Sequence, residues 1–406
     1  MKKTFVAAAV LGAFAASAMA ADVTLYGVID TGLHYSNKNV ESKHDVNSFD
    51  MKSGASAGNR WGLKGTEDLG NGYKVGFFLE NGFTEDDGKL GNGGRLFGRE
   101  ANLYVASDFG TLSFGRVGAL TSGCGSYDQM KYTPFATGWA GTATKANFML
   151  ADRDRMDNTV TYVTPEFAGF KVLAQYSFNR DGQETAGNER QNDRYAALGA
   201  AYKNGAFSSA LVVDTVMHNN KSANDKDSLG VTLGASYDFE VVKLFAMGQY
   251  GQHENFLGTT FDKGEKLAAG TYDSAYFKTV SSKGWKGYGV NLGATAPVLG
   301  GTVLAQASYL DAKTHDGMGY EYANKGTEIT ETQGVVSDGV KKASYKEAKA
   351  QNWGIALGYT YPFSKRTNVY TYVSYNETQV KTEAEAKDTD VTTKFTEFGL
   401  GIKHTF

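Results

Sequence analysis

The chain ends in a segment whose residues alternate between apolar and polar up to the final residue, Phe406. The apolar parity holds Phe398, Leu400, Ile402 and Phe406, and the other parity holds Glu397, Gly399, Gly401, Lys403 and Thr405. Successive side chains of a strand point to opposite faces, so the pattern predicts a strand with one apolar and one polar face. Chain ends without a partner fray. We therefore expect this strand to pair with the first strand of the mature chain, Val23 to Leu33, which would close a barrel.

The first twenty residues have the three regions of a secretory signal peptide. Lys2 and Lys3 supply the positive charge, Phe5 to Ala16 is the apolar run, and residues 18–20 (Ala-Met-Ala) form a small-x-small cleavage site. An ordinary buried helix is the less favoured alternative. The sequence therefore predicts a signal peptide over residues 1–20 and a single barrel domain over residues 21–406.

Composition excludes several classes of protein. No other stretch reaches the ~18 apolar residues that a membrane-spanning helix needs. Removing Lys2 and Lys3 changes the formal net charge from −3 to −5, and no basic patch suggests a nucleic-acid partner. The one cysteine, Cys124, excludes an intramolecular disulfide. The chain is rich in glycine (50), tyrosine (24) and phenylalanine (24), which suits β-strands with interfacial aromatic side chains.

Short alternating segments recur along the whole mature chain. Clear examples begin at Val23, Val75, Leu229 and Trp353, each with apolar residues at every second position. We place about 16 such segments of roughly ten residues, the length that a tilted strand needs to cross a bilayer. The opposite face of several segments holds glycine and alanine, which a packed soluble sandwich would replace with large side chains.

The connections between these segments alternate in length. Seven are short and contain turn-forming residues: 67–72, 108–111, 165–169, 204–205, the bend near Glu240, 297–301 and 362–366. The others are long and polar, for example 118–154, 253–285, 314–350 and 379–393. Short turns at one end and long loops at the other are typical of outer-membrane barrels with an even number of strands.

Five stretches carry a family resemblance: VTLYGVIDTGL from Val23, NRWGLKGTEDLGNGYKVGFFLE from Asn59, GREANLYVASDFGTLSFGR from Gly98, RMDNTVTYVTPEFAGFKVLAQYS from Arg155, and FGLGIKHTF from Phe398. The chain resembles the general trimeric porins of Gram-negative bacteria, of the type found in Neisseria and its relatives. The resemblance implies an all-β fold, a transmembrane antiparallel β-barrel of 16 strands with an inward-folded third loop.

The same resemblance implies function, partners and location. It implies a homotrimer in the outer membrane, in contact with lipid and lipopolysaccharide, through which small hydrophilic solutes and ions diffuse passively without a cofactor. It also implies that Phe406 is part of a signal read by the barrel assembly machinery. A role as an adhesin or receptor through the long surface loops stays open as the alternative.

Candidate pore residues follow from the third loop and from strand parity. The third loop, Gly118 to Asp154, is long enough to be functional, and Asp128 is its best acidic candidate, although Asp128 could instead cap a turn. Trp61 and Leu63 look lipid-facing, and charge on the lipid face costs ~2–4 kcal/mol at mid-bilayer. The inward basic candidates are therefore Arg60, Lys64 and Lys74, and the resemblance adds Arg99, Arg116 and Arg155.

Three questions about these residues stay open. Strict alternation places Arg116 on the face of Leu112 and Phe114, so its direction is not settled. Each arginine could instead form an ion pair at the rim. Inward acids, including Asp30, Glu80 and Asp214, make the lumen mixed in sign, so the sequence does not predict an ion preference.

Other chemistry finds little support in the sequence. Cys124 has no nearby histidine that could act as its base, and the six histidines show no metal-ligand spacing. The acidic run of residues 85–87 is more readily a solvated loop tip than a cation site. These patterns predict no metal site. Because no serine lies in a recognisable nucleophile motif, we also expect no enzyme.

Overall fold

The first and last strands lie side by side, as predicted. In β1 (Thr24–Val40) and β20 (Thr389–Thr405), antiparallel pairing runs from Val28 with Thr405 to Val40 with Thr393. Beyond the last strand, the Phe406 N–H donates to the Gly27 carbonyl and the Gly27 N–H to the Phe406 carbonyl, both at 3.1 Å. This seam closes the barrel and removes the edge that either strand would otherwise expose.

The structure is a computed structural model. It describes residues 23–40, 44–129, 131–135, 139, 148–151, 153–182, 192–219, 226–254, 260–261, 276–280, 284–315, 318–323, 340–384 and 389–406. The predicted signal peptide, residues 1–20, lies outside the described residues.

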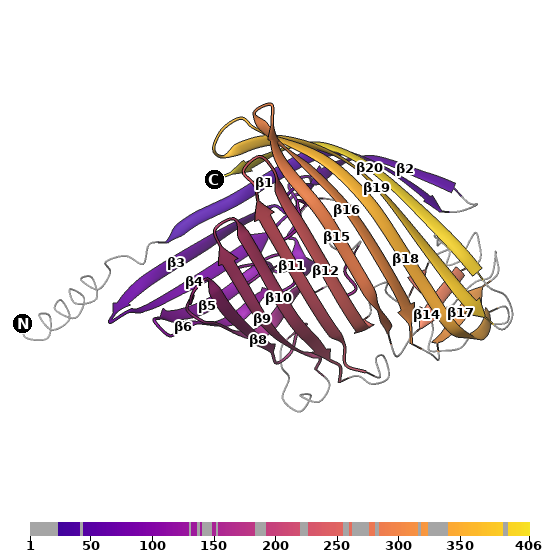
Figure 1. Ribbon diagram of the computed structural model, residues 1–406, viewed down its shortest axis with the longest axis horizontal. Coiled ribbons are helices and arrows are strands. Elements are labelled where there is room, and N and C mark those ends of the chain that lie inside the picture. The colour runs from indigo at the N-terminus through magenta and orange to yellow at the C-terminus, as the bar shows by residue number, and fades with distance from the viewer. Residues whose placement is uncertain are drawn as a thin grey trace, which may run out of the picture.

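Within the described residues, sixteen antiparallel strands form the ring (Figure 1). After β1 come β3 (Arg60–Gly70), β4 (Tyr73–Gly82), β5 (Glu100–Ser107), β6 (Gly110–Gly118), β7 (Arg155–Val163), β8 (Phe170–Ser177), β9 (Arg194–Asn204), β10 (Phe207–Met217), β11 (Leu229–Asp238), β12 (Lys243–Glu254), β15 (Trp285–Val298), β16 (Gly301–Thr314), β18 (Val340–Pro362), β19 (Thr367–Ala384) and β20. The predicted 16-stranded barrel is confirmed.

Shorter elements lie in the long connections. They are β2 (His44–Ser53), the 3-10 helix η1 (Asn92–Gly94), β13 (Thr260–Phe261), β14 (Tyr276–Val280) and β17 (Met318–Ala323). All seven predicted short turns join consecutive strands of the ring, and Gly205 in one of them has a φ of 54°, which favours glycine. The C-terminus lies at the short-turn end of the barrel (Figure 1). No helix among the described residues is long and apolar enough to cross a membrane.

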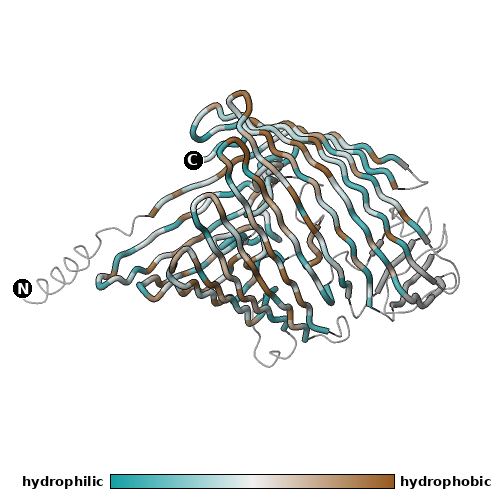
Figure 2. Tube along the Cα trace, viewed as in Figure 1, coloured by the Kyte–Doolittle hydropathy of each residue, from teal (hydrophilic) through white to brown (hydrophobic). Residues whose placement is uncertain are grey.

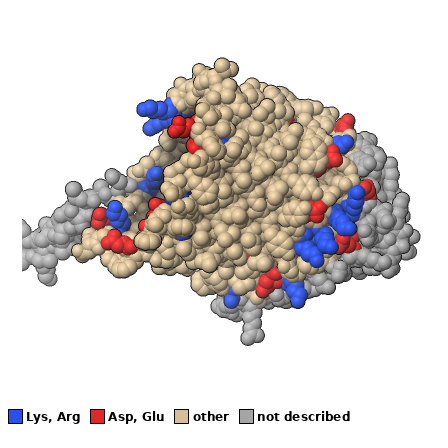
Figure 3. All heavy atoms as spheres, in the orientation of Figure 1, with Lys and Arg blue, Asp and Glu red and all other residues tan. Residues whose placement is uncertain are grey.

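The outward face of the barrel is apolar. Large side chains such as Leu233, Leu292, Ile355 and Leu400 are half exposed or more, with Leu292 at 63%. Figure 3 shows a broad uncharged surface with charged side chains gathered at its two ends. Figure 2 shows hydrophilic residues along β18–β20 toward the long-loop end. An apolar band between polar ends is the surface that a lipid bilayer covers.

The inward glycines make room for the third loop. The strand ends place this loop at residues 119–154, one residue shorter than predicted, because Gly118 belongs to β6. The Tyr132 ring lies against Gly234 and the Pro134 ring against Gly293, and the Phe148 backbone crosses Gly289. A Cβ added at Gly289 would overlap the Phe148 carbonyl oxygen. The described part of the third loop therefore packs on the wall from β11 to β15, as the predicted inward fold requires.

Aromatic contacts extend this packing to the far side of the lumen. Trp139 makes edge-to-face contacts with Phe135, Tyr370 and Tyr372, with ring centroids 5.1, 5.4 and 5.6 Å apart. Tyr370 and Tyr372 belong to β19. The described part of the third loop thus reaches from β7 across the barrel to β19.

A buried ion cluster fixes the end of the third loop. Arg153, 5% exposed, donates through Nε to Asp214 on β10 at 2.7 Å and makes two hydrogen bonds of 2.8 Å with Glu254 on β12. Burial alone would lower the pKa of Arg153, but the carboxylates of Asp214 and Glu254 raise it above its usual value. Because charge-assisted bidentate pairs are strong and directional, this cluster locks the loop base to the wall.

Candidate functional site

A cavity of about 740 Å³ lies between the third loop and the wall formed by β3, β4 and β5. Five of the predicted site residues line it: Arg60, Lys64, Arg99, Asp128 and Arg155. They come from β3, the segment before β5, the third loop and the start of β7. The barrel therefore brings together residues that are up to 95 positions apart in the sequence.

Two arginines share one carboxylate in this cavity. The Arg99 Nε lies 2.6 Å from Glu80 Oε1, and the Arg60 Nε lies 3.6 Å from Glu80 Oε2. The Tyr26 hydroxyl also donates to Glu80 Oε2, at 3.1 Å. The alternation predicts that Glu80 faces the lumen from β4, and there it lies beside both guanidinium groups. One carboxylate therefore partly neutralises two guanidinium groups.

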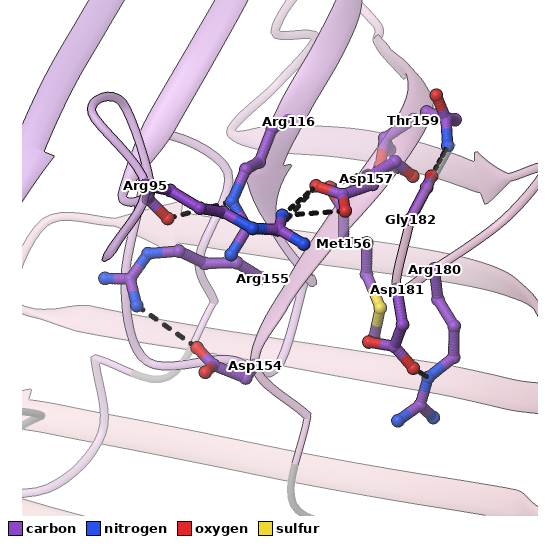
Figure 4. A network of polar contacts seen from close by, with 12 residues as sticks. Arg95, Arg116, Asp154, Arg155, Met156, Asp157, Thr159, Arg180, Asp181 and Gly182 are labelled. Carbon is purple, nitrogen blue, oxygen red and sulfur yellow. Dashed lines mark hydrogen bonds and ion pairs between the residues drawn. The ribbon is translucent and has the colours of Figure 1, made fainter. Parts of the chain in front are cut away.

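Arg155 is the third arginine of the group. Its Nε donates to the Arg99 carbonyl at 2.8 Å, and its Nη1 lies 3.2 Å from Asp154 Oδ1. Figure 4 shows Arg155 directed to Asp154. Lys64 adds a fourth cation, with its Nζ 5.4 Å from the centre of the Tyr26 ring, a cation–π distance.

Two of the four acids that line the cavity are shielded, Asp128 on the third loop and Glu100 on β5. Asp128 is 6% exposed, and its Oδ1 accepts the Gly123 N–H at 2.8 Å, so it both stabilises a turn of the loop and lines the cavity. Glu100, 5% exposed, accepts the Asn102 amide at 2.6 Å. Asp154, with its side chain 76% exposed, is open to solvent.

The charge open to the cavity is therefore positive. Arg60, Lys64, Arg99 and Arg155 face Glu80 and Asp154, while Glu100 and Asp128 lie beneath the loop surface. Of the carboxylates open to the cavity, Glu80 lies on β4 beside the arginines and Asp154 lies at the end of the third loop. An excess of one sign of charge in a narrow passage distinguishes ions by sign.

The structure places Lys74 and Arg116 away from the lining of this cavity. Lys74 is the second residue of β4, opposite Ala106, and is exposed at the short-turn end. Arg116 lies at a bulge between Gly115 and Val117, and its Nη1 contacts Asp157 at 2.6 Å. Arg95 contacts the same carboxylate at 2.8 Å (Figure 4). The sequence left open whether Arg116 forms an ion pair, and the structure contains this ion pair.

The sequence does not predict the roles of Glu100 and the short segment 54–59 in the cavity lining, or that of Arg153 at the base of the third loop. Parity with Asn102 was a usable signal for Glu100, since both lie on the inward face of β5. Arg153 carries no such signal, because a loop has no period.

The other candidate residues have ordinary partners. Ser53 and Asn59 hydrogen-bond Glu85, and the pKa of Asp87 is lowered to about 2 by hydrogen bonds from Lys89 and Thr84. The Cys124 Sγ lies 3.9 Å from Asp154 Oδ1. The described residues contain no group of three or more His, Cys, Asp or Glu arranged to hold a metal ion.

Comparison with known proteins identifies the class. Residues 7–381 match the family model described as Gram-negative porin. The chain is 33% identical to an outer membrane porin protein of Bordetella pertussis over the full length of both. It is 31% identical to the outer membrane porin protein 32 of Delftia acidovorans, covering 92% of this chain and 89% of the relative.

The fold agrees with a solved structure. The anion-selective porin from Comamonas acidovorans superposes with a TM-score of 0.62 at 24% identity, covering 95% of this chain and 99% of that one. The chain belongs to the Gram-negative porin family. It is an outer-membrane porin, a water-filled β-barrel through which small hydrophilic solutes and ions diffuse passively.

Proposed function

We propose that the cavity between the third loop and β3–β5 is the narrowest section of the diffusion path and gives the channel a weak preference for anions. The observation that carries the proposal is the sharing of Glu80 by Arg60 and Arg99. With Lys64 and Arg155, four cations line the cavity together with four carboxylates. Two of these carboxylates, Glu100 and Asp128, are buried, and Glu80 and Asp154 are open to the cavity. Lys74 and Arg116 are not part of this constriction.

The expected strength of the preference follows from electrostatics. A unit charge about 5 Å from a passing ion in water contributes about 0.8 kcal/mol, a factor of about four in occupancy. Salt in the pore screens part of this energy. Because carboxylates offset two of the four cations, the surplus favours anions without excluding cations.

Arg60→Ser is the first test of this constriction. We expect the ratio of chloride to potassium permeability to fall by about twofold, because one of the two guanidinium groups beside Glu80 is lost. The measurement is the reversal potential of purified protein in a planar bilayer under a salt gradient. Arg366→Ser, in the short turn between β18 and β19, is the control and should leave the ratio unchanged. An unchanged ratio in Arg60→Ser would remove Arg60 from the proposed constriction.

We infer that the protein acts as a channel and not as an enzyme. The cavity lining supports this inference, because the hydroxyl of one lining serine, Ser122, donates to the Cys124 carbonyl at 2.7 Å. A nucleophile would instead need a hydrogen bond to a base.

We further propose a homotrimer that contacts outer-membrane lipid and lipopolysaccharide, with Phe406 as a signal for the barrel assembly machinery. Two observations support a special role for Phe406. Its backbone completes the β1 ladder, and its ring covers Gly27, where an added Cβ would meet the ring. These contacts give the last residue a packing role as well.

Deletion of Phe406 tests its role as an assembly signal. We expect the yield of folded trimer in cells to fall severalfold, since the signal and the last ladder bonds are both lost. Phe406→Tyr keeps an aromatic ring over Gly27 and should assemble normally. The measurement is the mass and amount of native, detergent-solubilised protein in outer membranes. Normal assembly after the deletion would leave only the packing role, and a single-chain mass for the native protein would contradict the trimer.

A further inference from the structure

The wall of the cavity is interrupted by a short inward segment, residues 54–59 (Gly-Ala-Ser-Ala-Gly-Asn). β1 pairs with β3 as far as Val28 with Arg60, and then with β2 from Thr31 with Ser53 onward. The six residues between β2 and β3 therefore leave the sheet. Their direction is inward, because Gly54, Ala57 and Gly58 line the cavity that holds the charged residues.

Asp30 holds this segment in a defined conformation. The Asp30 side chain is fully buried on the inward face of β1, and its Oδ2 accepts the backbone N–H groups of Ser56 at 3.1 Å and Ala57 at 2.7 Å. The Asp30 carbonyl accepts the Gly54 N–H at 2.8 Å and the Asn59 amide at 3.1 Å. These four hydrogen bonds to Asp30 fix the conformation of the segment and attach it to β1.

The segment also packs on the third loop. Ala55, 3% exposed, belongs to the buried cluster that contains Phe135 and Trp139 of the loop and Tyr370 of β19. The segment and the loop therefore share one apolar contact. Since packed clusters transmit displacement, the positions of the two are coupled.

Gly58 contacts two of the arginines. The Gly58 carbonyl accepts the Arg60 Nη1 at 2.9 Å. A Cβ added at Gly58 would lie 3.0 Å from the Arg99 Nη1, closer than ordinary contacts. Small residues here leave room for both guanidinium groups and for open space beside them.

We propose that residues 54–59 form the second lip of the constriction, next to the third loop, and that the small side chain at Ala57 sets the size limit for solutes. This inference rests on the proposed function of the cavity. It assigns selection by charge to the arginines and selection by size to the inward segment. A larger side chain at position 57 would occupy the path directly, while leaving all four cations in place.

Ala57→Trp tests the proposal, with Ala106→Trp as the matched control. Ala106 lies on the inward face of β5 at the short-turn end, outside the cavity lining. We expect Ala57→Trp to lower single-channel conductance by about twofold or more, and to slow the uptake of larger sugars by reconstituted liposomes more than that of small ones. Ala106→Trp should change both much less.

The outcomes separate the two proposals. Unchanged conductance and sugar uptake in Ala57→Trp, with the Arg60→Ser effect intact, would overturn the second lip and keep the charged constriction. If neither variant has an effect, the cavity is not in the path and both proposals fail. If Ala57→Trp does not fold, Ala57→Cys in a Cys124→Ser background decides. A bulky, uncharged thiosulfonate should then reduce the current of the Ala57→Cys channel and leave Ala55→Cys unaffected, and no reduction would overturn the proposal.

Discussion

Arg153→Met should lower the free energy of unfolding by about 3–5 kcal/mol, the usual cost of breaking a buried ion pair. Methionine fills similar space but leaves Asp214 and Glu254 as two buried carboxylates without their shared cation. The third loop would lose its attachment to β10 and β12. We therefore also expect frequent transient closures in single-channel records. Guanidinium unfolding in lipid vesicles measures the first effect, and planar-bilayer recordings measure the second.

Two further variants make this result specific. Lys171→Met breaks the exposed pair with Glu166, 3.1 Å apart, and should cost less than about 1 kcal/mol. Adding Asp214→Asn and Glu254→Gln to Arg153→Met should recover part of the lost stability, because the uncompensated charges cause most of the cost. If Arg153→Met were no more destabilising than Lys171→Met, the buried cluster would not be the anchor of the third loop.

Gly289→Val should displace the third loop from the wall. The new Cβ would overlap the Phe148 carbonyl oxygen, and overpacking of this kind costs about 1–3 kcal/mol. Because the loop can move only into the lumen, we expect a lower single-channel conductance as well as lower stability. Conductance steps in planar bilayers and unfolding in vesicles provide the two readouts.

Gly248→Val is the matched control for this substitution. Gly248 lies on β12, faces outward, and has no atom nearer than 3.9 Å to an added Cβ. Stability should change by less than about 0.5 kcal/mol, and conductance should stay as in the unmodified protein. A Gly289→Val channel with unaltered conductance would show that the loop does not depend on this close approach.

Strand parity explains why so much of the fold is readable from the sequence. A one-residue slip would turn every apolar side chain of a strand to the lumen, so alternation fixes both the face and the register. The seam of β1 with β20 follows this rule: Leu33 pairs with Leu400, and both face outward. The same parity places Arg60, Lys64 and Glu80 in the lumen.

Parity ends where the strands end, and there the sequence was less informative. The bulge at Arg116 interrupts the alternation, so its ion pair with Asp157 could not be read from the pattern. The segment 54–59 contains small residues typical of a turn, and only the buried Asp30 reveals that it folds inward. The partners of Arg153 come from strands 61 and 101 residues away. Contacts at such separations depend on the closed barrel and not on local sequence.

The reversal potential of the unmodified protein in a planar bilayer, under a gradient of potassium chloride, tests the central claim most directly. Potassium and chloride ions have similar mobilities, so the potential reports the charge of the narrowest section. Four cations against two accessible carboxylates should let chloride pass more readily, and the side of higher salt should become positive. A negative potential on that side would mean a preference for cations and would contradict the proposed constriction.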